Sequence, residues 1–363
     1  MLASISCSVF ETFRPELGMR EPSDVTLPYA AVWTAFLVWA LALTYRAVRT
    51  VTDARAPRVI AAYLAYLAVA LVSAWMPEER TWRTSDEDEP VKTAAPGRAK
   101  AIGRDEAEDV MTAQAELVRA ETAKLRRGRK GVVDLYFVGF AGHSQDVFLQ
   151  EVVYARELFD ERFDTRGRSV VLVNNARTKE TLPIASLTNL RATLADVAKA
   201  MNPGEDVLFL WLASHGAKEH ELSVRNGSLP LRQLGTDALV DALKRAGIEW
   251  RVIVVDACYS GGFVEPLKDD RTMVMTSASA DHKSYGCGDE DEMTYFGKAY
   301  LRHGLWWKHS FEESFAEAAS LIRRWELRDE LSHSNPQIHV GSEIRAKLDA
   351  LERRGARKET LDG

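Results

Sequence analysis

Two uncharged stretches lie near the start of the chain, at residues 25–45 and 59–77. A helix needs about 20 predominantly apolar residues to cross a hydrocarbon core of about 30 Å, and both stretches meet that length. We therefore expect a two-helix membrane anchor over residues 25–77, after an N-terminal tail over residues 1–24. The alternative, a pair of helices buried in a soluble domain, is disfavoured because a short charged loop joins the two stretches.

The loop between the two stretches is rich in arginine. It contains one acidic residue, Asp53, against Arg46, Arg49, Arg55 and Arg58. Positive residues favour the cytoplasmic side of a membrane, so this loop predicts that both termini face the other side. Arg80 and Arg83, which follow the second stretch, partly balance this bias. The expectation is an integral membrane protein whose large C-terminal part faces the periplasm or the exterior.

A charged segment over residues 78–130 separates the anchor from the rest of the chain. Its acidic run at residues 86–89 and its prolines are typical of a solvated tether. From Glu106 to Arg126 the apolar residues recur at helical spacing, which predicts a coupling helix packed on the edge of the following domain. The basic run at residues 126–130 then ends this helix.

Apolar strand-like runs alternate with helical patterns through the remainder of the chain. The predicted strands are 132–138, 170–173, 207–213, 250–255, 272–276 and 337–340. The predicted helices are 146–163, 187–201, 231–246 and one that opens at Ser310. Continuous apolar strands separated by helices indicate a parallel sheet covered on both faces, an α/β/α sandwich. Residues 342–363 are expected to form a charged C-terminal tail, in which residues 343–358 form a solvated amphipathic helix.

The amino-acid composition excludes a few classes of protein but does not indicate a particular activity. The chain has 363 residues, 28% of them charged, and a net charge of −6, which disfavours a nucleic-acid-binding protein. An apolar content of 46% excludes disorder over most of the length. The three cysteines cannot form a disulfide framework. The class of chemistry must therefore be sought in particular side chains.

Two strand ends carry reactive side chains. The strand at 207–213 is followed by His215 and Gly216, and the strand at 250–255 by Cys258 in a run rich in small residues. In open α/β sheets the site lies beyond the carboxyl ends of the strands. Neighbouring strands would bring the thiol and the imidazole together, which is the minimal equipment for nucleophilic acyl transfer. The alternative is a buried structural cysteine and a capping histidine.

These residues resemble the legumain family of cysteine peptidases, in the caspase-like clan, which includes the catalytic subunit of GPI transamidase. Residues 256–261, Asp-Ala-Cys-Tyr-Ser-Gly, are similar to Glu-Ala-Cys-Glu-Ser-Gly of legumain. Residues 284–287, Ser-Tyr-Gly-Cys, and 294–297, Thr-Tyr-Phe-Gly, resemble Ser-Tyr-Ala-Cys and Thr-Tyr-Leu-Gly. The resemblance implies a caspase-like peptidase domain over residues 131–341. The anchor suggests a bacterial membrane-bound branch, at the inner membrane with the domain in the periplasm.

The resemblance also implies roles for individual residues. Cys258 would be the nucleophile, and His215 the acid/base that protonates the leaving amine. The backbone N–H groups of Gly216 and Cys258 would form the oxyanion hole. Asp146 is the candidate for the side chain that orients the histidine. Charge compensation at a helix N-terminus is the alternative role for Asp146.

The specificity pocket departs from the family pattern. Legumain recognises asparagine with an arginine, a glutamate and an aspartate, and the positions that align here are Phe148, Asp256 and Lys298. Ser284 is expected beside them in the substrate-binding site. Asp256 and Lys298 could still bind a carboxamide, the pocket could equally prefer another side chain, or the two residues could form only a structural pair.

The sequence therefore predicts a membrane-anchored cysteine endopeptidase that acts on a peptide or protein substrate. No metal site, cofactor or nucleic-acid partner is expected, and the lipid bilayer is the second expected partner. Two alternatives stay open. One is a transpeptidase that transfers the same acyl-enzyme to an amine, and the other is a non-catalytic membrane scaffold.

Overall fold

A computed structural model describes residues 102–288 and 291–362, with side chains described as far as residue 353. The predicted N-terminal tail, both predicted spans and most of the predicted linker lie outside the described residues. In the described part, no helix combines the length and apolar character that crossing a membrane requires.

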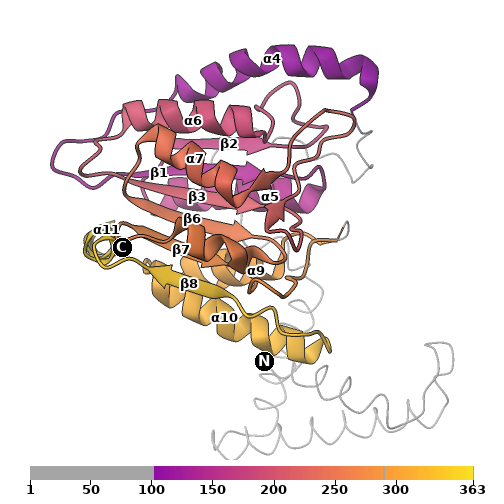
Figure 1. The fold of residues 1–363 in the computed structure, drawn as a ribbon. Helices are drawn as coiled ribbons and strands as arrows, with labels where there is room; N and C mark the ends of the chain where they lie inside the picture. The colour runs from indigo at the N-terminus through magenta and orange to yellow at the C-terminus, as the bar shows by residue number, and fades with distance from the viewer. Residues whose placement is uncertain (1–101, 289–290, 363) are drawn as a thin grey trace, which may run out of the picture. The chain divides into compact units, whose positions relative to one another are not determined.

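A six-stranded sheet forms the centre of the described part (Figure 1). Its strand order is β2-β1-β3-β6-β7-β8. The strands are β1 (Leu135–Ala141), β2 (Ser169–Val173), β3 (Val207–Ala213), β6 (Arg251–Asp256), β7 (Thr272–Thr276) and β8 (Gln337–Val340). All neighbours pair in parallel except β7 and β8. The predicted parallel sheet is confirmed, with one antiparallel edge strand.

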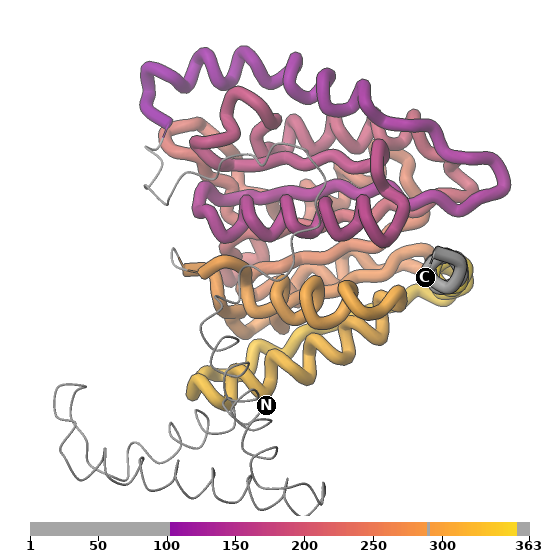
Figure 2. Tube along the Cα trace, turned by 180° about the vertical axis from the view of Figure 1, so that it is seen from behind, coloured from indigo at the N-terminus to yellow at the C-terminus, as the bar shows by residue number. Residues whose placement is uncertain are grey.

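Helices cover both faces of this sheet. One face carries α5 (Asp146–Arg162), the π-helical turn η4 (Lys298–Leu305) and α10 (Phe311–Arg328). The other carries α6 (Leu187–Ala200), α7 (Thr236–Ala246) and the short α8 (Val264–Leu267). Helix α4 (Arg104–Thr122) lies on the outer side of α6 (Figure 1), and Figure 2 shows α5 and α10 from behind. The α/β/α sandwich is confirmed.

The smaller elements lie in the connections between these layers. They are β4 (Glu221–Leu222), β5 (Leu234–Gly235), the 3₁₀ turn η3 (Ser260–Phe263), α9 (Tyr295–Gly297) and α11 (Ile344–Asp362). Helix α10 begins as its sequence predicts, because the Ser310 side chain accepts a hydrogen bond from the Glu313 backbone N–H. Helix α7 ends at Gly247, whose φ of 70° suits glycine.

Two predicted segments differ from the structure. The helix predicted from residue 231 begins only at Thr236, because Leu234 and Gly235 pair with Glu221 and Leu222 in an antiparallel ribbon. The helix predicted within the C-terminal tail is present as α11, but its first turns are not solvated as expected. The first turns of α11 place Ile344 and Leu348 in the same buried cluster as the side chains of α5 and α10.

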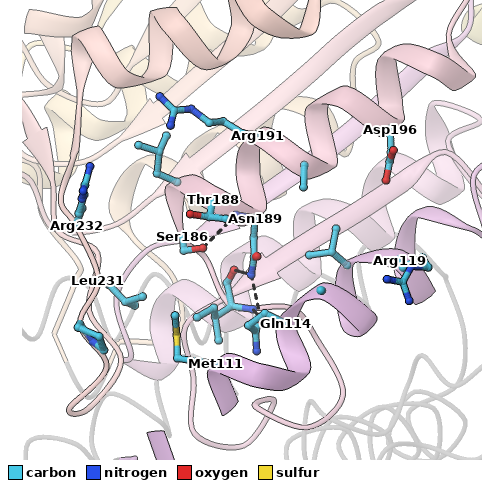
Figure 3. A pocket seen from close by; sticks show the side chains of 16 residues that line it. Met111, Gln114, Arg119, Ser186, Thr188, Asn189, Arg191, Asp196, Leu231 and Arg232 are labelled. Carbon is cyan, nitrogen blue, oxygen red and sulfur yellow. Dashed lines mark hydrogen bonds between the residues drawn. The ribbon is translucent and has the colours of Figure 1, made fainter. Parts of the chain in front are cut away.

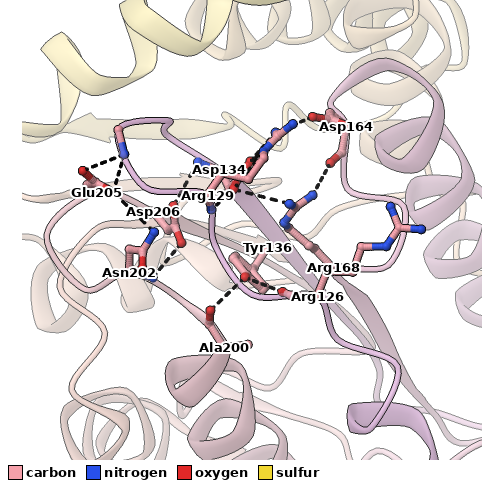
Figure 4. Close-up of polar contacts among 11 residues, drawn as sticks. Arg126, Arg129, Asp134, Tyr136, Asp164, Arg168, Ala200, Asn202, Glu205 and Asp206 are labelled. Atoms are coloured by element: carbon pink, nitrogen blue, oxygen red, sulfur yellow. Dashed lines mark hydrogen bonds and ion pairs between the residues drawn. The ribbon is translucent and has the colours of Figure 1, made fainter.

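A buried ionic network closes the end of the sheet where β1 and β3 begin (Figure 4). Asp134, about 1% exposed, is paired with Arg129 and lies 3.4 Å from Arg168, whose side chain is about 5% exposed. Burial opposes ionisation of Asp134, but hydrogen bonds from Arg129 and the charge of Arg168 outweigh it and lower the pKa of Asp134. This network lies at the opposite end of the strands from the candidate site.

Candidate active site

The ends of β1, β3 and β6 form one rim, and β3 lies between the other two. In the register of the β3–β6 pair, Ala213 is opposite Asp256. His215 and Cys258 each follow that pair by two residues. The prediction that neighbouring strands deliver the imidazole and the thiol to a common edge is therefore confirmed.

Gly216 lies directly against the backbone of Cys258. A Cβ atom at position 216 would stand 1.9 Å from the Cys258 carbonyl oxygen and 3.1 Å from the Cβ of Ala257. Real Cβ atoms do not approach backbone so closely, so this contact requires glycine. The glycine after the histidine lets the two loops touch.

Cys258 is partly exposed and lies beside Ser284. Its Sγ is 3.5 Å from the Ser284 carbonyl oxygen, and the Ser284 hydroxyl is 3.8 Å from Sγ. Tyr259, the next residue, has a φ of 59°, which is unusual for a bulky side chain. Its N–H donates to His282 O at 2.7 Å, and its carbonyl lies 3.1 Å from His220 Nδ1. These contacts fix the sharp turn that ends β6 at the thiol.

Three residues that follow β1 surround the His215 ring. The Nε2 atom of His215 is in hydrogen-bond contact with the side-chain oxygen of Gln145. The rings of Phe148 and His143 stand edge-on to His215, with centroids 5.1 Å and 4.7 Å away. An amide oxygen can only accept, so the Gln145 contact places hydrogen on Nε2 and the lone pair of the neutral ring on Nδ1.

The structure does not place Asp146 on the histidine. The Asp146 carboxylate contacts Arg177 Nη2 at 2.5 Å and Asn175 Nδ2 at 2.8 Å. Asp146 is the first residue of α5, whereas Gln145 is its N-cap and points to the imidazole. The contact expected between Asp146 and the imidazole is therefore absent, and the side chain that contacts His215 is the amide of Gln145, one position earlier.

Two of the four predicted substrate-binding residues are buried. Asp256 is about 1% exposed and Phe148 is fully buried, so neither side chain can contact a substrate in this arrangement. Lys298 is exposed, and its Nζ lies 5.9 Å from the centroid of the Trp325 ring. Ser284, which contacts Cys258, is the predicted pocket residue that the structure brings to the thiol.

A pair of carboxyl groups lies behind the rim. Asp256 is among the predicted site residues, whereas Glu151 is not. Glu151 on α5 and Asp256 on β6 are both fully buried and both contact Thr294. Burial and the charge of Asp256 raise the pKa of Glu151 well above its usual range, and burial also raises the pKa of Asp256. Glu151 carries a sequence signal, because it lies three residues after Phe148 on the apolar face of its helix.

The backbone N–H groups of Gly216 and Cys258 have no acceptor among the described residues. Gly216 bridges to Leu222, but the bonds of that bridge come from its neighbours, Ala217 N–H to Glu221 O and Ser223 N–H to His215 O. Two donors without a protein acceptor therefore lie on the loops that carry the imidazole and the thiol.

A separate cavity of about 650 Å³ lies between α4 and α6 (Figure 3). Gln114 and Asn189 hydrogen-bond across it at 2.9 Å, and Arg119, Arg191 and Arg232 lie around it. Neither His215 nor Cys258 lines this cavity. It is not part of the candidate active site.

Residues 188–341 match the Peptidase C13 family. The match contains His215 and Cys258, and the resemblance to the legumain family is confirmed over that segment. No curated protein matches the chain significantly. A solved structure similar to this chain is caspase-1 from Spodoptera frugiperda, at 12% identity and a TM-score of 0.39, over 57% of this chain and 86% of that one. The family match supports a cysteine peptidase or a related activity.

Proposed function

We propose that this protein is a cysteine endopeptidase in which Cys258 is the nucleophile and His215 the acid/base. The observation that carries the proposal is the contact of Gly216 with the Cys258 backbone, because it holds the two loops at one rim. The family match over residues 188–341 supports the same chemistry.

The reaction proceeds through an acyl-enzyme. Cys258 Sγ, having given its proton to His215 Nδ1, attacks the carbonyl carbon of the peptide bond, and the carbonyl π electrons move to oxygen. When the tetrahedral intermediate collapses, the C–N bond breaks, and the proton on Nδ1 passes to the leaving amine. A water molecule then attacks the thioester carbonyl and gives its proton to Nδ1. Collapse of that intermediate releases the acid, and the sulfur takes the proton back.

The surrounding residues support individual steps. The N–H groups of Gly216 and Cys258 donate to the oxyanion of each tetrahedral intermediate, a contribution that is often the largest single stabilisation in acyl transfer. Gln145 holds His215 by accepting from Nε2–H, so that Nδ1 faces proton transfer. Phe148 and His143 pack edge-on against the imidazole and limit its rotation.

The proposal is tested by labelling the full chain with peptidyl electrophiles that differ in one side chain, followed by mass spectrometry of the modified cysteine. We expect modification at Cys258, loss of labelling and of peptide cleavage in Cys258→Ala, and retention of both in the matched control Cys287→Ser. Modification at Cys287 alone, or cleavage that persists in Cys258→Ala, would refute the assignment. Adding an amine nucleophile to the same assay separates hydrolysis from transpeptidation.

We also propose that residues 25–45 and 59–77 anchor the domain in a bilayer, on the strength of their length and lack of charge. The expected result is that the full chain stays in the membrane fraction after alkaline carbonate washing, whereas a chain that begins at residue 94 is released. A C-terminal reporter that is active only in the cytoplasm would reject the periplasmic orientation.

A further inference from the structure

Glu151 links α5, to which it belongs, directly to β3 and, through Thr294, to the end of β6. Its Oε1 accepts from Trp211 Nε1–H on β3 at 3.1 Å, and its Oε2 accepts from the Thr294 backbone N–H at 3.1 Å. Thr294 also contacts Asp256, two residues before Cys258. Tyr295 N–H donates to Tyr285 O at 2.9 Å, which ties the same turn to the segment beside the thiol.

The hydroxyl of Thr294 has more polar neighbours than its single hydrogen can satisfy. It accepts from Gly297 N–H at 2.8 Å, and it lies 2.7 Å from Glu151 Oε2 and 2.6 Å from Asp256 Oδ2. The hydroxyl hydrogen can be donated to only one carboxyl oxygen. The second short contact requires a hydrogen on the other carboxyl group. The geometry therefore calls for at least one proton on the Glu151–Asp256 pair.

The surroundings of the pair favour the same conclusion. Both carboxyl groups are fully buried, and no ion pair within the described residues involves either of them. The facing groups are Trp211, Ser277, Thr294 and Gly297, none of which carries a charge. Cys287 is the titratable neighbour, and burial raises the pKa of its thiol to about 11, so it stays neutral at physiological pH. Two adjacent charges buried without a cation are strongly unfavourable.

We propose that Glu151 is a positioning residue that shares one proton with Asp256 behind the rim and so locks α5 to the strand that carries Cys258. This inference rests on the proposed peptidase function. The N-cap Gln145 and the first-turn residue Phe148 of α5 lie at the His215 ring, six and three residues before Glu151. A helix shift that followed loss of the proton would move the imidazole relative to the thiol.

The carboxyl pair predicts the direction in which the reaction rate at Cys258 changes with pH. Because the pKa of Glu151 is raised, the shared proton is retained above the pH at which an exposed glutamate ionises, and it is lost as the pH rises through that raised value. Two negative charges then face one another across Thr294. The competent geometry, and the rate of reaction at Cys258, should decline on the alkaline side.

The experiment uses the full chain in detergent and two readouts. The first is the infrared C=O band of a buried carboxylic acid, followed against pH in the wild type and in Glu151→Gln. The second is the pH dependence of the rate constant for labelling Cys258 with a peptidyl electrophile. Glu157→Gln, at an exposed carboxylate on the same helix, is the matched control.

We expect the wild-type band to disappear over the same pH range in which labelling declines. In Glu151→Gln, which has no proton to lose at that position, the decline should move upward by at least about 1 pH unit. Glu151→Ala should lower the rate about 10-fold or more at every pH, because it removes the carboxyl group that links Trp211 and Thr294, together with the packing of that side chain. Glu157→Gln should retain the wild-type profile.

The outcomes separate this inference from the proposed function. Labelling at Cys258 without a carboxylic-acid band, or with superimposable profiles in the wild type and Glu151→Gln, would overturn the inference alone. A band that is lost in Glu151→Gln, with no reaction at Cys258 under any condition, would refute the peptidase and the positioning role while leaving the shared proton in place.

Discussion

The contact between Gly216 and Cys258 can be tested by adding a single methyl group. In Gly216→Ala the new Cβ would lie 1.9 Å from the Cys258 carbonyl oxygen and 3.0 Å from its carbonyl carbon. Both are backbone atoms, so no side-chain rotation can relieve the overlap. The two loops must separate by about 1 Å before the contact becomes tolerable, and a misplacement of that size costs a reaction about 10²-fold.

The same substitution should have only a moderate effect on folding. Overpacking of this kind typically costs about 1–3 kcal/mol, which corresponds to a fall in Tm of about 2–10 °C for a domain of this size. The most affected quantity should therefore be the rate constant for labelling Cys258, lowered about 10²-fold, with most of the chain still folded at 25 °C. Circular dichroism on heating measures the stability, and labelling followed by mass spectrometry measures the site.

Gly204→Ala is the matched control, because a Cβ at that position meets nothing within 4 Å. It should change neither quantity. If Gly216→Ala lowers the Tm as expected but labels Cys258 within about 3-fold of the wild-type rate, the contact stabilises the fold without setting the relation between His215 and Cys258. That result would remove the main geometrical support for the proposed peptidase.

Two further predictions concern other parts of the described structure. Asp134→Asn should destabilise the protein by about 3–5 kcal/mol, because it leaves Arg168 buried beside a neutral group. The control is Asp164→Asn, at the exposed partner of Arg129, which should cost less than about 1 kcal/mol. Because the pKa of Asp134 is lowered, its contribution to the free energy of unfolding is present above about pH 4 and is lost as the pH falls through the lowered value. Urea titrations should therefore show a free energy of unfolding that falls less steeply with acid in Asp134→Asn than in the wild type. Cys287, whose pKa burial raises to about 11, should react with iodoacetamide at pH 8 about 10²-fold more slowly in the folded protein than in urea, and equal rates would show that its thiol is not buried.

Much of the fold could be predicted because most of its elements carry local signals. The strand at 207–213 is a continuous apolar run, and β3 has the same bounds. The start of α7 could not be predicted, since Leu231 and Leu234 continue a helical pattern that a non-local pairing with β4 overrides. Strand β1 is three residues later than its prediction, because Val132 and Val133 look strand-like whereas Gly139 and Ala141 do not.

The site could be predicted only at residues whose side chains are reactive by type. A histidine and a cysteine at the ends of two apolar strands are visible in the sequence, and the strand order then brings them together. Gln145 was missed because an amide one residue before a helical carboxylate has no distinctive pattern, and only the three-dimensional approach of α5 to His215 selects it. Asp256 was predicted to face the substrate, but its direction depends on Thr294 and Glu151, which are distant in the chain.

Glu151 is an example of a buried site residue that does carry a signal in the sequence. A carboxylate on the apolar face of a helix must either reach solvent or find a partner, because an isolated buried charge is too costly to retain. Here the apolar face packs on a sheet whose strands β1 and β3 are buried along their whole length, so solvent is out of reach. The remaining solutions are a cation or a shared proton. The contacts of Thr294 select the proton, and the position of Asp256 two residues before Cys258 connects that choice to the candidate nucleophile.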